Sequence, residues 1–298
     1  MIPVAPNVSN GWHSTPATTL IAVDLDRTLI YSRRWFSDTD RDTAWCVERR
    51  DGREVSFMTP AAMAALEQLA AGPGQIVVPA TTRALAHYQR IALPGGPYRY
   101  AVTSNGGTIL VDGQPDPTWT ATVAATLRAE SVPLEVLRTA LHTAISAADW
   151  VHRVVVVDGL FCYVAIDESA LPQDFIELWK DWCEPRGWKV VRQDRKIYTL
   201  PRSLCKSHAV EEVRKRLTTR GELIADAPVL AAGDGALDTA LLAAANAAIR
   251  PSHGELHNTG WRTAKTVVAT AFGAKAAEQI LTWCRLRAEA GRAEGTSV

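Results

Sequence analysis

The chain has 298 residues, of which 47% are hydrophobic and 21% are charged, and its 32 basic residues balance its 32 acidic ones. This composition is typical of a soluble globular protein that is long enough for a domain with a sizeable insertion. Because the formal net charge is zero, no field attracts nucleic acid or an anionic membrane, and we expect neither as a partner.

The cysteines and the hydropathy pattern favour a cytoplasmic location. The chain has five cysteines and no C-x-x-C pair, which favours reduced thiols over a disulfide framework or a zinc site. Residues 1–16 lack the basic region and the apolar segment of a signal peptide. No apolar run approaches the ~18 residues that a membrane helix needs. The sequence does not indicate an oligomeric state.

Four nearly continuous apolar segments are typical of parallel strands that are covered on both faces. Helices are predicted from Thr59-Pro60 to Gly72 and from Ser207 to about Leu217. Strands that alternate with helices in this way indicate a doubly wound, Rossmann-like α/β core. The expected strands are 19–23, 75–80, 100–103 and 228–232.

Two other segments of the core have their own patterns. Residues 45–58 predict a β-hairpin with Asp51-Gly52 at its turn, and we expect this hairpin to stand beside the end of the first strand as a flap. Residues 271–287 predict a C-terminal helix.

The middle of the chain predicts a small inserted α+β domain, the cap. Its elements follow the order α-β-β-α-β-β, which gives a four-stranded sheet covered on one face by two helices. We therefore divide the chain into a first core part (1–114), the cap (115–202) and a second core part (203–298). The expected cap elements are a helix at 134–145, two strands around Asp158-Gly159, a helix at 175–183, and strands at 188–193 and 196–201.

Polar residues follow each of the four predicted core strands. They are Asp24 and Asp26, the segment 81–83, Ser104-Asn105, and Asp234. In doubly wound sheets ligands bind beyond the carboxyl ends of the strands, so these side chains are expected to converge.

An aspartate at the end of a buried strand suits an aspartyl-phosphate nucleophile, which must be rigid, ionised and close to a cation. Asp24 holds this position, and Asp26 is near enough to protonate a leaving oxygen and later activate water. Mg²⁺ prefers oxygen ligands, and Asp24 with Asp234 could supply two of them.

Several residues offer donors to a phosphoryl group. Thr81, Ser104 and Asn105 provide neutral donors, and Lys206 provides a positive charge at the start of a helix, where the helix N-terminus adds its own partial charge.

Four ordered motifs resemble those of the haloacid dehalogenase superfamily. They are DLDRT at 24–28, TTR at 81–83, CKSHAV with Lys206, and GDGALDTALL with Asp234 and Asp238. The place of the inserted domain and the SNGG turn at 104–107 resemble the subgroup that contains sucrose-phosphate phosphatase, mannosyl-3-phosphoglycerate phosphatase and the Cof-type sugar phosphatases, which carry a C2-type cap.

The resemblance implies a role for each matching residue. Asp24 would be the nucleophile and Asp26 the general acid/base. Magnesium would be held by Asp24, the backbone carbonyl of Asp26, and Asp234, with Asp238 nearby. The phosphate-binding candidates are Thr81, Thr82, Asn105 and Lys206.

The chain departs from the family pattern at three positions. Thr82 and Ser207 stand where the family usually has glycine, and Leu237 replaces an asparagine that supports the metal site. Asp238 could then act through water. These departures indicate a divergent branch and argue against sucrose phosphate as the substrate.

We therefore expect a Mg²⁺-dependent phosphomonoester hydrolase that acts on a sugar phosphate or a similar small phosphorylated metabolite. Two alternatives stay open: a phosphomutase or phosphotransferase of the phosphomannomutase type, and a non-catalytic ligand-binding protein, against which the intact Asp26 argues.

Substrate selection is expected to lie in the cap and the flap, because the core motifs contact only the phosphoryl group and the metal. The candidate cap contacts are Arg192, Arg195 and Lys196. Arg33-Arg34-Trp35 could recognise a second anionic group of the substrate, although an ordinary exposed pair of arginines is the simpler interpretation.

Overall fold

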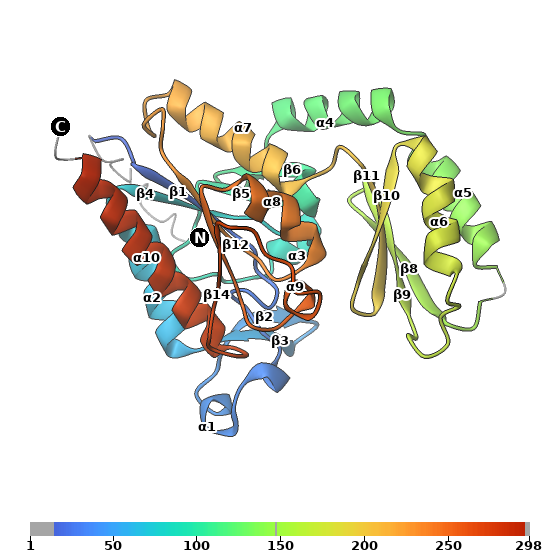
Figure 1. Ribbon diagram of the computed structural model, residues 1–298, viewed down its shortest axis with the longest axis horizontal. Coiled ribbons are helices and arrows are strands. Elements are labelled where there is room, and N and C mark those ends of the chain that lie inside the picture. Colours follow the sequence, from blue (N-terminus) through green and yellow to red (C-terminus); the bar gives the residue numbers. More distant parts are fainter. Residues whose placement is uncertain (1–14, 147, 296–298) are drawn as a thin grey trace, which may run out of the picture.

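The computed structural model describes residues 15–146 and 148–295. An α/β core and a smaller α+β unit lie next to each other along the long axis of the molecule (Figure 1). Residues 1–14, which hold most of the segment tested for a signal peptide, lie outside the described residues. The core sheet is parallel, in the order β14 (Thr266–Val268), β13 (Ala247–Arg250), β12 (Val229–Ala232), β1 (Thr19–Val23) and β4 (Gln75–Pro79).

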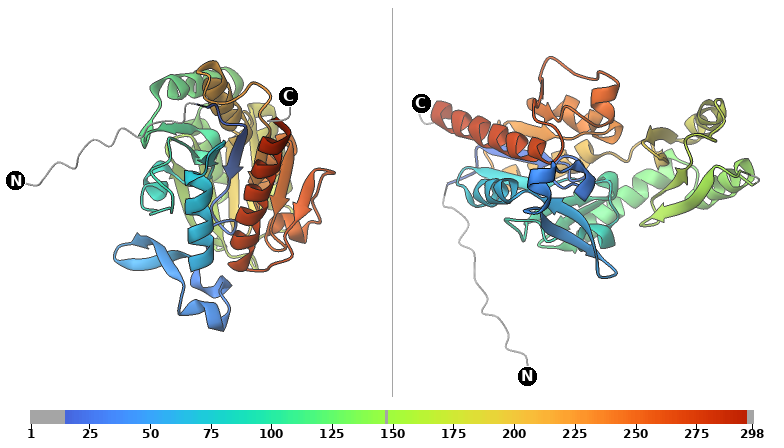
Figure 2. Two further views of the ribbon diagram at one scale, coloured as in Figure 1. Left: turned by 90° about the vertical axis from the view of Figure 1, so that its left-hand side faces the viewer. Right: turned by 90° about the horizontal axis from the view of Figure 1, so that it is seen from below.

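Helices cover both faces of this sheet, and every residue of β1 is therefore buried. Ile21 and Val23 pack against the helices of one face, and Leu20 and Ala22 pack against those of the other. The two helices of the first face lie side by side, as Figure 2 shows. The first face carries α2 (Pro60–Ala71) and α10 (Lys275–Gly295), and the second carries α7 (Lys206–Thr219) and α8 (Thr239–Ala244). The predicted doubly wound core is confirmed.

The third predicted strand, β5 (Tyr100–Thr103), lies beside the end of β4 through a parallel bridge between Ala80 and Val102. It then turns back into β6 (Thr108–Val111) and β7 (Gln114–Pro115), which pair antiparallel. These two strands were not predicted, and neither were the short strands β13 and β14, of which β14 is at the edge of the core sheet.

The flap forms as predicted from β2 (Trp45–Arg50) and β3 (Arg53–Met58). Asp51 and Gly52 both have positive φ, 50° and 74°, as the tight turn of a two-residue hairpin requires. The hairpin projects from the core (Figure 2). Its base is joined to the loop after β1 by the antiparallel bridge between Tyr31 and Phe57.

The cap sheet has the order β10-β11-β9-β8 and is antiparallel. Two predicted helices cover one of its faces, and the other face is turned toward the core (Figure 1). An unpredicted helix, α4 (Pro117–Glu130), precedes them and spans from core to cap. The remaining cap elements are α5 (Leu134–Ala144), β8 (Val151–Val157), β9 (Phe161–Ile166), α6 (Phe175–Cys183), β10 (Trp188–Gln193) and β11 (Lys196–Pro201).

Both hairpin turns of the cap touch the core. In the β8–β9 turn, the Asp158 carboxylate accepts hydrogen bonds from the backbone N–H of Leu85, at 2.8 Å, and from the hydroxyl of Ser104. In the β10–β11 turn, Asp194 accepts a hydrogen bond from Arg27 at 2.9 Å. Leu237 of the core adds an apolar contact, because it belongs to the buried cluster of the cap.

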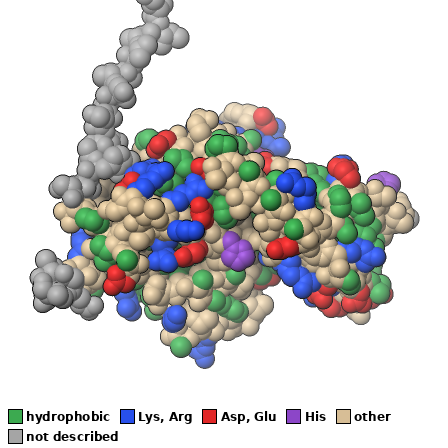
Figure 3. All heavy atoms as spheres, turned by 90° about the horizontal axis from the view of Figure 1, so that it is seen from above, with side chains coloured by type: hydrophobic (Ala, Val, Ile, Leu, Met, Phe, Trp, Pro, Cys, Tyr) green, Lys and Arg blue, Asp and Glu red, His purple; other side chains and the backbone are tan. Residues whose placement is uncertain are grey.

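The short helices of the core are α1 (Asp38–Arg41), α3 (Leu85–Tyr88) and α9 (Glu255–Asn258). None of the helices in the described ranges has the length and the apolar character needed to cross a bilayer. Figure 3 shows basic and acidic side chains interspersed over one face of the molecule, in keeping with the balanced charge of the sequence.

Candidate active site

A cleft of about 1200 Å³ lies between the carboxyl end of the core sheet, the flap and the open face of the cap sheet. Asp24, Asp234 and Lys206 line it from the core, Glu48 lines it from the flap, and Lys196 lines it from the cap. The polar residues after β1, β4 and β12 therefore converge on the cleft, whereas Ser104 and Asn105 after β5 are outside its lining.

Asp24 continues β1 by one residue, since its backbone N–H donates to the carbonyl of Ala232 at 2.9 Å. Its carboxylate is buried and accepts hydrogen bonds from Lys206 Nζ at 2.6 Å and from Thr28 Oγ1 at 3.3 Å. Asp26 follows two residues later and also lines the cleft, and 52% of its side chain is exposed. The carboxylate of Asp24 is thus buried, and that of Asp26 is half exposed.

Three carboxylates gather on the floor of the cleft. Asp24, Asp234 and Asp238 each offer an oxygen, and these oxygens lie within 4.8 Å of one another. Lys206 Nζ bridges Asp24 and Asp238 at 2.6 Å from each. Oδ2 of Asp234 is buried and has no hydrogen-bond partner among the described residues. Three buried carboxylates with one ammonium and one orphaned oxygen fit a divalent cation with oxygen ligands.

The pKa values reflect this crowding. Burial and the charge of Asp238 raise the pKa of Asp24 to about 7, although Lys206 opposes the shift. Burial, with the charges of Asp24 and Asp238, raises the pKa of Asp234 well above its usual value. Burial would lower the pKa of Lys206, but the carboxylates of Asp238 and Asp24 outweigh it and raise that pKa. The ammonium stays charged, and a bound cation would relieve the repulsion among the carboxylates.

The phosphate-binding candidates differ in their positions. Thr81 is buried, and its hydroxyl accepts a hydrogen bond from the backbone N–H of Arg83 at 3.1 Å. Thr81, Thr82 and Lys206 line the cleft.

Asn105 is buried beside the cleft and is not part of its lining. Its amide donates to the carbonyl of Leu204 at 3.1 Å, directly before the segment that carries Lys206. Gly106 allows this close approach, because a Cβ there would lie 2.2 Å from the carbonyl oxygen of Cys205. We therefore propose that Asn105 positions Lys206 and makes no direct contact with phosphate.

No family model matches the sequence, and no curated protein matches it. Solved structures do match it. The sucrose-phosphatase of Synechocystis sp., solved with sucrose and phosphate, is 15% identical with a TM-score of 0.60, over 90% of this chain and 98% of that one. A haloacid dehalogenase-like hydrolase from Bacteroides thetaiotaomicron is 14% identical with a TM-score of 0.52, over 88% and 99%. This chain has the haloacid dehalogenase-like fold.

A trehalose-6-phosphate phosphatase related protein shares this fold, with a TM-score of 0.51 and 15% identity over 90% of this chain and 97% of that one. At such low identity the likeness concerns the haloacid dehalogenase-like fold alone. The roles of individual side chains have to be argued from their own surroundings.

Leu237 shows how this chain adapts the haloacid dehalogenase-like fold. The sequence pattern suggested that it interrupts the support of the metal site. In the structure it is buried among the apolar residues of the cap, where an amide would be without partners. The neighbouring Asp238 accepts hydrogen bonds from Lys206 at 2.6 Å and from the backbone N–H of Gly235 at 3.0 Å. Asp238 is therefore placed to hold the lysine.

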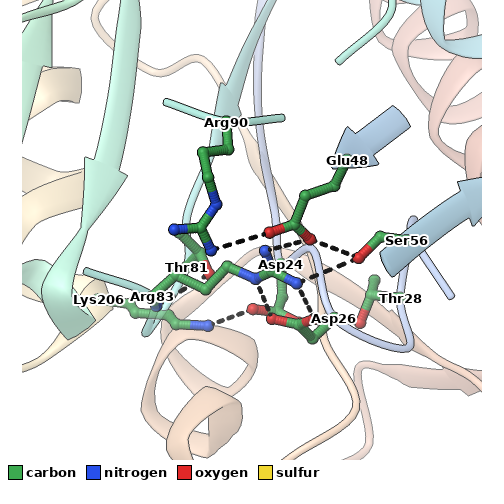
Figure 4. A network of polar contacts seen from close by, with 9 residues as sticks. All are labelled: Asp24, Asp26, Thr28, Glu48, Ser56, Thr81, Arg83, Arg90 and Lys206. Atoms are coloured by element: carbon green, nitrogen blue, oxygen red, sulfur yellow. Dashed lines mark hydrogen bonds and ion pairs between the residues drawn. The ribbon is translucent and has the colours of Figure 1, made fainter. Parts of the chain in front are cut away.

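Arg83 links the cleft floor to the flap, and the sequence reasoning assigned it no role. Its guanidinium donates to both carboxylate oxygens of Asp26 at 2.7 Å, and to Glu48 at 2.7 Å (Figure 4). Glu48 is almost completely buried and also binds Ser56 at 2.6 Å and Arg90 at 3.2 Å. Burial would raise the pKa of Asp26, but the charge and hydrogen bonds of Arg83 outweigh burial and lower that pKa.

The cap residues predicted as substrate contacts separate into two groups. Arg195 and Lys196 line the cleft, whereas Arg192 is outside the lining and binds Glu168 at 2.6 Å. Arg33 is likewise occupied, because it binds Glu54 of the flap at 2.8 Å. Arg34 lines the cleft.

Proposed function

We propose that the protein is a Mg²⁺-dependent phosphomonoesterase that acts through a phosphorylated Asp24. The observation that carries the proposal is the pairing of a fixed carboxylate, Asp24, with a buried lysine, Lys206, beside the orphaned oxygen of Asp234. A nucleophilic carboxylate needs such a cationic environment, because its target phosphoryl group is itself an anion. Proteins that share the fold include ones named sucrose-phosphatase and trehalose-6-phosphate phosphatase related protein, which supports a small phosphorylated metabolite as substrate.

The first half-reaction would form one bond and break one. An oxygen of Asp24 attacks phosphorus, the P–O ester bond breaks, and the leaving oxygen takes a proton from Asp26. Lys206 and the hydroxyl of Thr81 would bind the phosphoryl oxygens. The carboxylates of Asp24 and Asp234 and the backbone carbonyl of Asp26 would hold Mg²⁺, which when bound neutralises the phosphoryl charge and the carboxylates together.

The second half-reaction would regenerate Asp24. Water attacks the phosphorus, Asp26 takes the proton that the water loses, and the bond from Asp24 to phosphorus breaks to release inorganic phosphate. Arg83 keeps Asp26 ionised in the free protein, which is the form that accepts this proton. An entering phosphate ester competes with Asp26 for Arg83, because both are anions, and so favours the protonated form that the first half-reaction uses.

The test is the hydrolysis of p-nitrophenyl phosphate with Mg²⁺ and with EDTA, by the wild type and by Asp24→Asn. We expect hydrolysis to require Mg²⁺ and to fall by about 10⁴-fold or more in Asp24→Asn. Asp226→Asn, which changes an exposed aspartate outside the cleft, is the matched control and should keep wild-type activity. Turnover that survives either EDTA or Asp24→Asn would contradict the mechanism.

A further inference from the structure

The open face of the cap sheet carries two cations in one row. In the antiparallel register, Arg153 of β8 is opposite Ala165 of β9, and Ala165 is opposite Lys196 of β11. Residues that are opposite each other in an antiparallel sheet project from the same face. All three line the cleft. Because Ala165 contributes only a methyl group, a gap is left between the two basic side chains.

The next row on this face is aromatic. Tyr163 and Tyr198 are opposite each other on β9 and β11, and both line the cleft. Lys196 Nζ lies 4.9 Å from the ring centroid of Tyr163 and 5.9 Å from that of Tyr198. Among the described residues, the ammonium has these rings as neighbours and neither a hydrogen bond nor an ion pair. A lysine in this position has given up part of its hydration without gaining a carboxylate.

Apart from Arg34, which also has no carboxylate within ion-pair distance among the described residues, the other lysines and arginines that line the cleft are paired within the protein. Lys206 is paired with Asp24, Arg83 with Asp26, and Arg27 with Asp194. Within the described ranges, neither Arg153 nor Lys196 has a carboxylate within ion-pair distance.

The surroundings of Lys196 disfavour its positive charge. Burial lowers the pKa of Lys196, and the charges of Arg83, Arg153 and Arg27 lower it further, against the opposing charge of Asp26. An anion between Arg153 and Lys196 would stabilise both cations. The strands that carry them are two steps apart in the sheet, about 10 Å, a distance that two long side chains can close around a carboxylate or a phosphate.

We propose that Arg153 and Lys196 form a subsite for a second anionic group, and that the substrate is a phosphomonoester whose leaving group carries its own carboxylate or phosphate. This inference rests on the proposed function, because it assigns the reacting phosphoryl group to Asp24 and Lys206. The second anion then lies across the cleft, on the cap face. A phosphate ester of a neutral sugar would leave the two cations unpaired and bind more weakly.

The experiment compares matched pairs of substrates. 3-Phosphoglycerate is compared with glycerol 3-phosphate, which lacks the carboxylate, and glucose 1,6-bisphosphate is compared with glucose 6-phosphate, which lacks the second phosphate. We expect kcat/KM to be at least about tenfold higher for the anionic member of one pair, since one ion pair in a partly buried site is worth about that factor. The pair with the larger ratio identifies the second anion.

Lys196→Gln and Arg153→Gln test the assignment to residues. Each should reduce the ratio of anionic to neutral substrate to about 1–3, mainly through KM. Arg192→Gln is the matched control, because Arg192 belongs to the same cap hairpin but binds Glu168 and is outside the cleft lining. It should keep the wild-type ratio. Wild-type ratios near 1 for both pairs, or a ratio that both cleft variants leave unchanged, would overturn the subsite.

Binding separates this proposal from the phosphatase mechanism. Calorimetric dissociation constants of the same four compounds are measured for Asp24→Asn with Mg²⁺, with and without Lys196→Gln. If the wild type hydrolyses none of the compounds but binding shows the same Lys196-dependent preference, the mechanism fails and the subsite stands. If the wild type hydrolyses them without preference and binding shows none, the subsite fails and the mechanism stands.

Discussion

Lys206 and Lys196 line the same cleft in opposite surroundings. Lys206 is almost completely buried and is held 2.6 Å from each of two carboxylates. Lys196 has aromatic rings beside it and no carboxylate. On the core side the protein supplies the counter-charges itself, so the site is organised before substrate enters. On the cap face the counter-charge has to come from the ligand, which suits a surface that selects among substrates.

We expect the largest difference between the two lysines when each is replaced, because only the replacement of Lys206 should lower both the stability and the turnover. Lys206→Met would leave Asp24 and Asp238 buried without their cation, which costs about 3–5 kcal/mol of unfolding free energy. It should also reduce phosphatase turnover by about 10³-fold or more. Lys196→Met should change the unfolding free energy by less than about 0.5 kcal/mol, because it breaks no ion pair.

Urea unfolding measures these values, and Lys215→Met is the control, since Lys215 is exposed on the same helix as Lys206. If the Lys206 and Lys196 variants were equally stable, the ion pairs of Lys206 would not contribute to stability, and the distinction between the two lysines would be wrong.

Glu48 of the flap belongs to the ion pairs that the protein forms on the core side of the cleft. The variant Glu48→Gln tests whether this carboxylate contributes to catalysis. Without the carboxylate, Arg83 and Arg90 lose a shared counter-ion, and Arg83 no longer has a fixed position from which to hold Asp26. We expect kcat for an aryl phosphate to fall by about 10- to 100-fold with little change in KM, as for a positioning residue.

Glu54→Gln in the same hairpin is the control, because Glu54 pairs with exposed arginines at the rim. A change in KM alone would place Glu48 with the substrate contacts and not with the core network.

Asp234→Asn sharpens the comparison by removing a carboxylate whose Oδ2 is buried and has no hydrogen-bond partner among the described residues. The metal-free protein should become more stable by about 1–2 kcal/mol, because an amide among Asp24 and Asp238 is less repelled than a carboxylate. The rise in melting temperature on addition of Mg²⁺, which binding to the folded state produces, should shrink in the variant. Thermal unfolding in EDTA and in Mg²⁺ measures both, and a metal-free variant less stable than the wild type would be the contrary result.

The smallest expected effect concerns His253, which fastens the loop after β1 to the C-terminal part of the core. Its Nδ1 accepts from the backbone N–H of Gly273 at 3.3 Å, so its Nε2 donates to the carbonyl of Arg27 at 3.1 Å. Burial lowers the pKa of His253, and the charges of Arg27 and His257 lower it further. The unfolded chain therefore binds a proton below about pH 6.5 that the folded protein resists.

The contribution of the neutral His253 to the unfolding free energy is fully present above that pH. It is lost as the pH falls toward the pKa of His253 in the folded protein. Relative to His253→Gln, the wild type should lose about 1 kcal/mol of unfolding free energy between pH 7.5 and pH 5. Urea midpoints across this range measure the difference, with His142→Gln as the exposed control. A difference that does not vary with pH would exclude the neutral imidazole as its cause.

The sequence predicted the floor of the cleft because parallel strands bring their carboxyl ends to one edge. Asp24 and Asp234 follow neighbouring strands, so their approach follows from topology alone. Glu48 could not be found in this way. Its partner Arg83 is 35 positions away, and within the flap its charge was indistinguishable from those of an exposed hairpin. The register of the flap against the core decides which of its charges is buried, and no local pattern encodes that register.

The helix α4 was missed for a different reason. Its start had a readable signal, since Asp116 caps the backbone N–H of Trp119 at 2.6 Å and Pro117 follows. Only Val123 is buried along its length, so the apolar stripe that marks a core helix is absent. A helix that runs over the surface between two units makes few apolar contacts, and its sequence therefore needs no apolar stripe.

The contacts between the two cap turns and the core have a kinetic consequence. Asp158 and Asp194 hold the cap through hydrogen bonds and one partly exposed ion pair, of a kind worth about 1 kcal/mol or less each. Leu237 and Ala84 of the core also pack against the apolar cluster of the cap. We expect the cap to swing as a rigid body about the segments that connect it to the core, on the microsecond to millisecond scale of hinge motions. Product escape would then be governed by how often two aspartates release their donors at the same time.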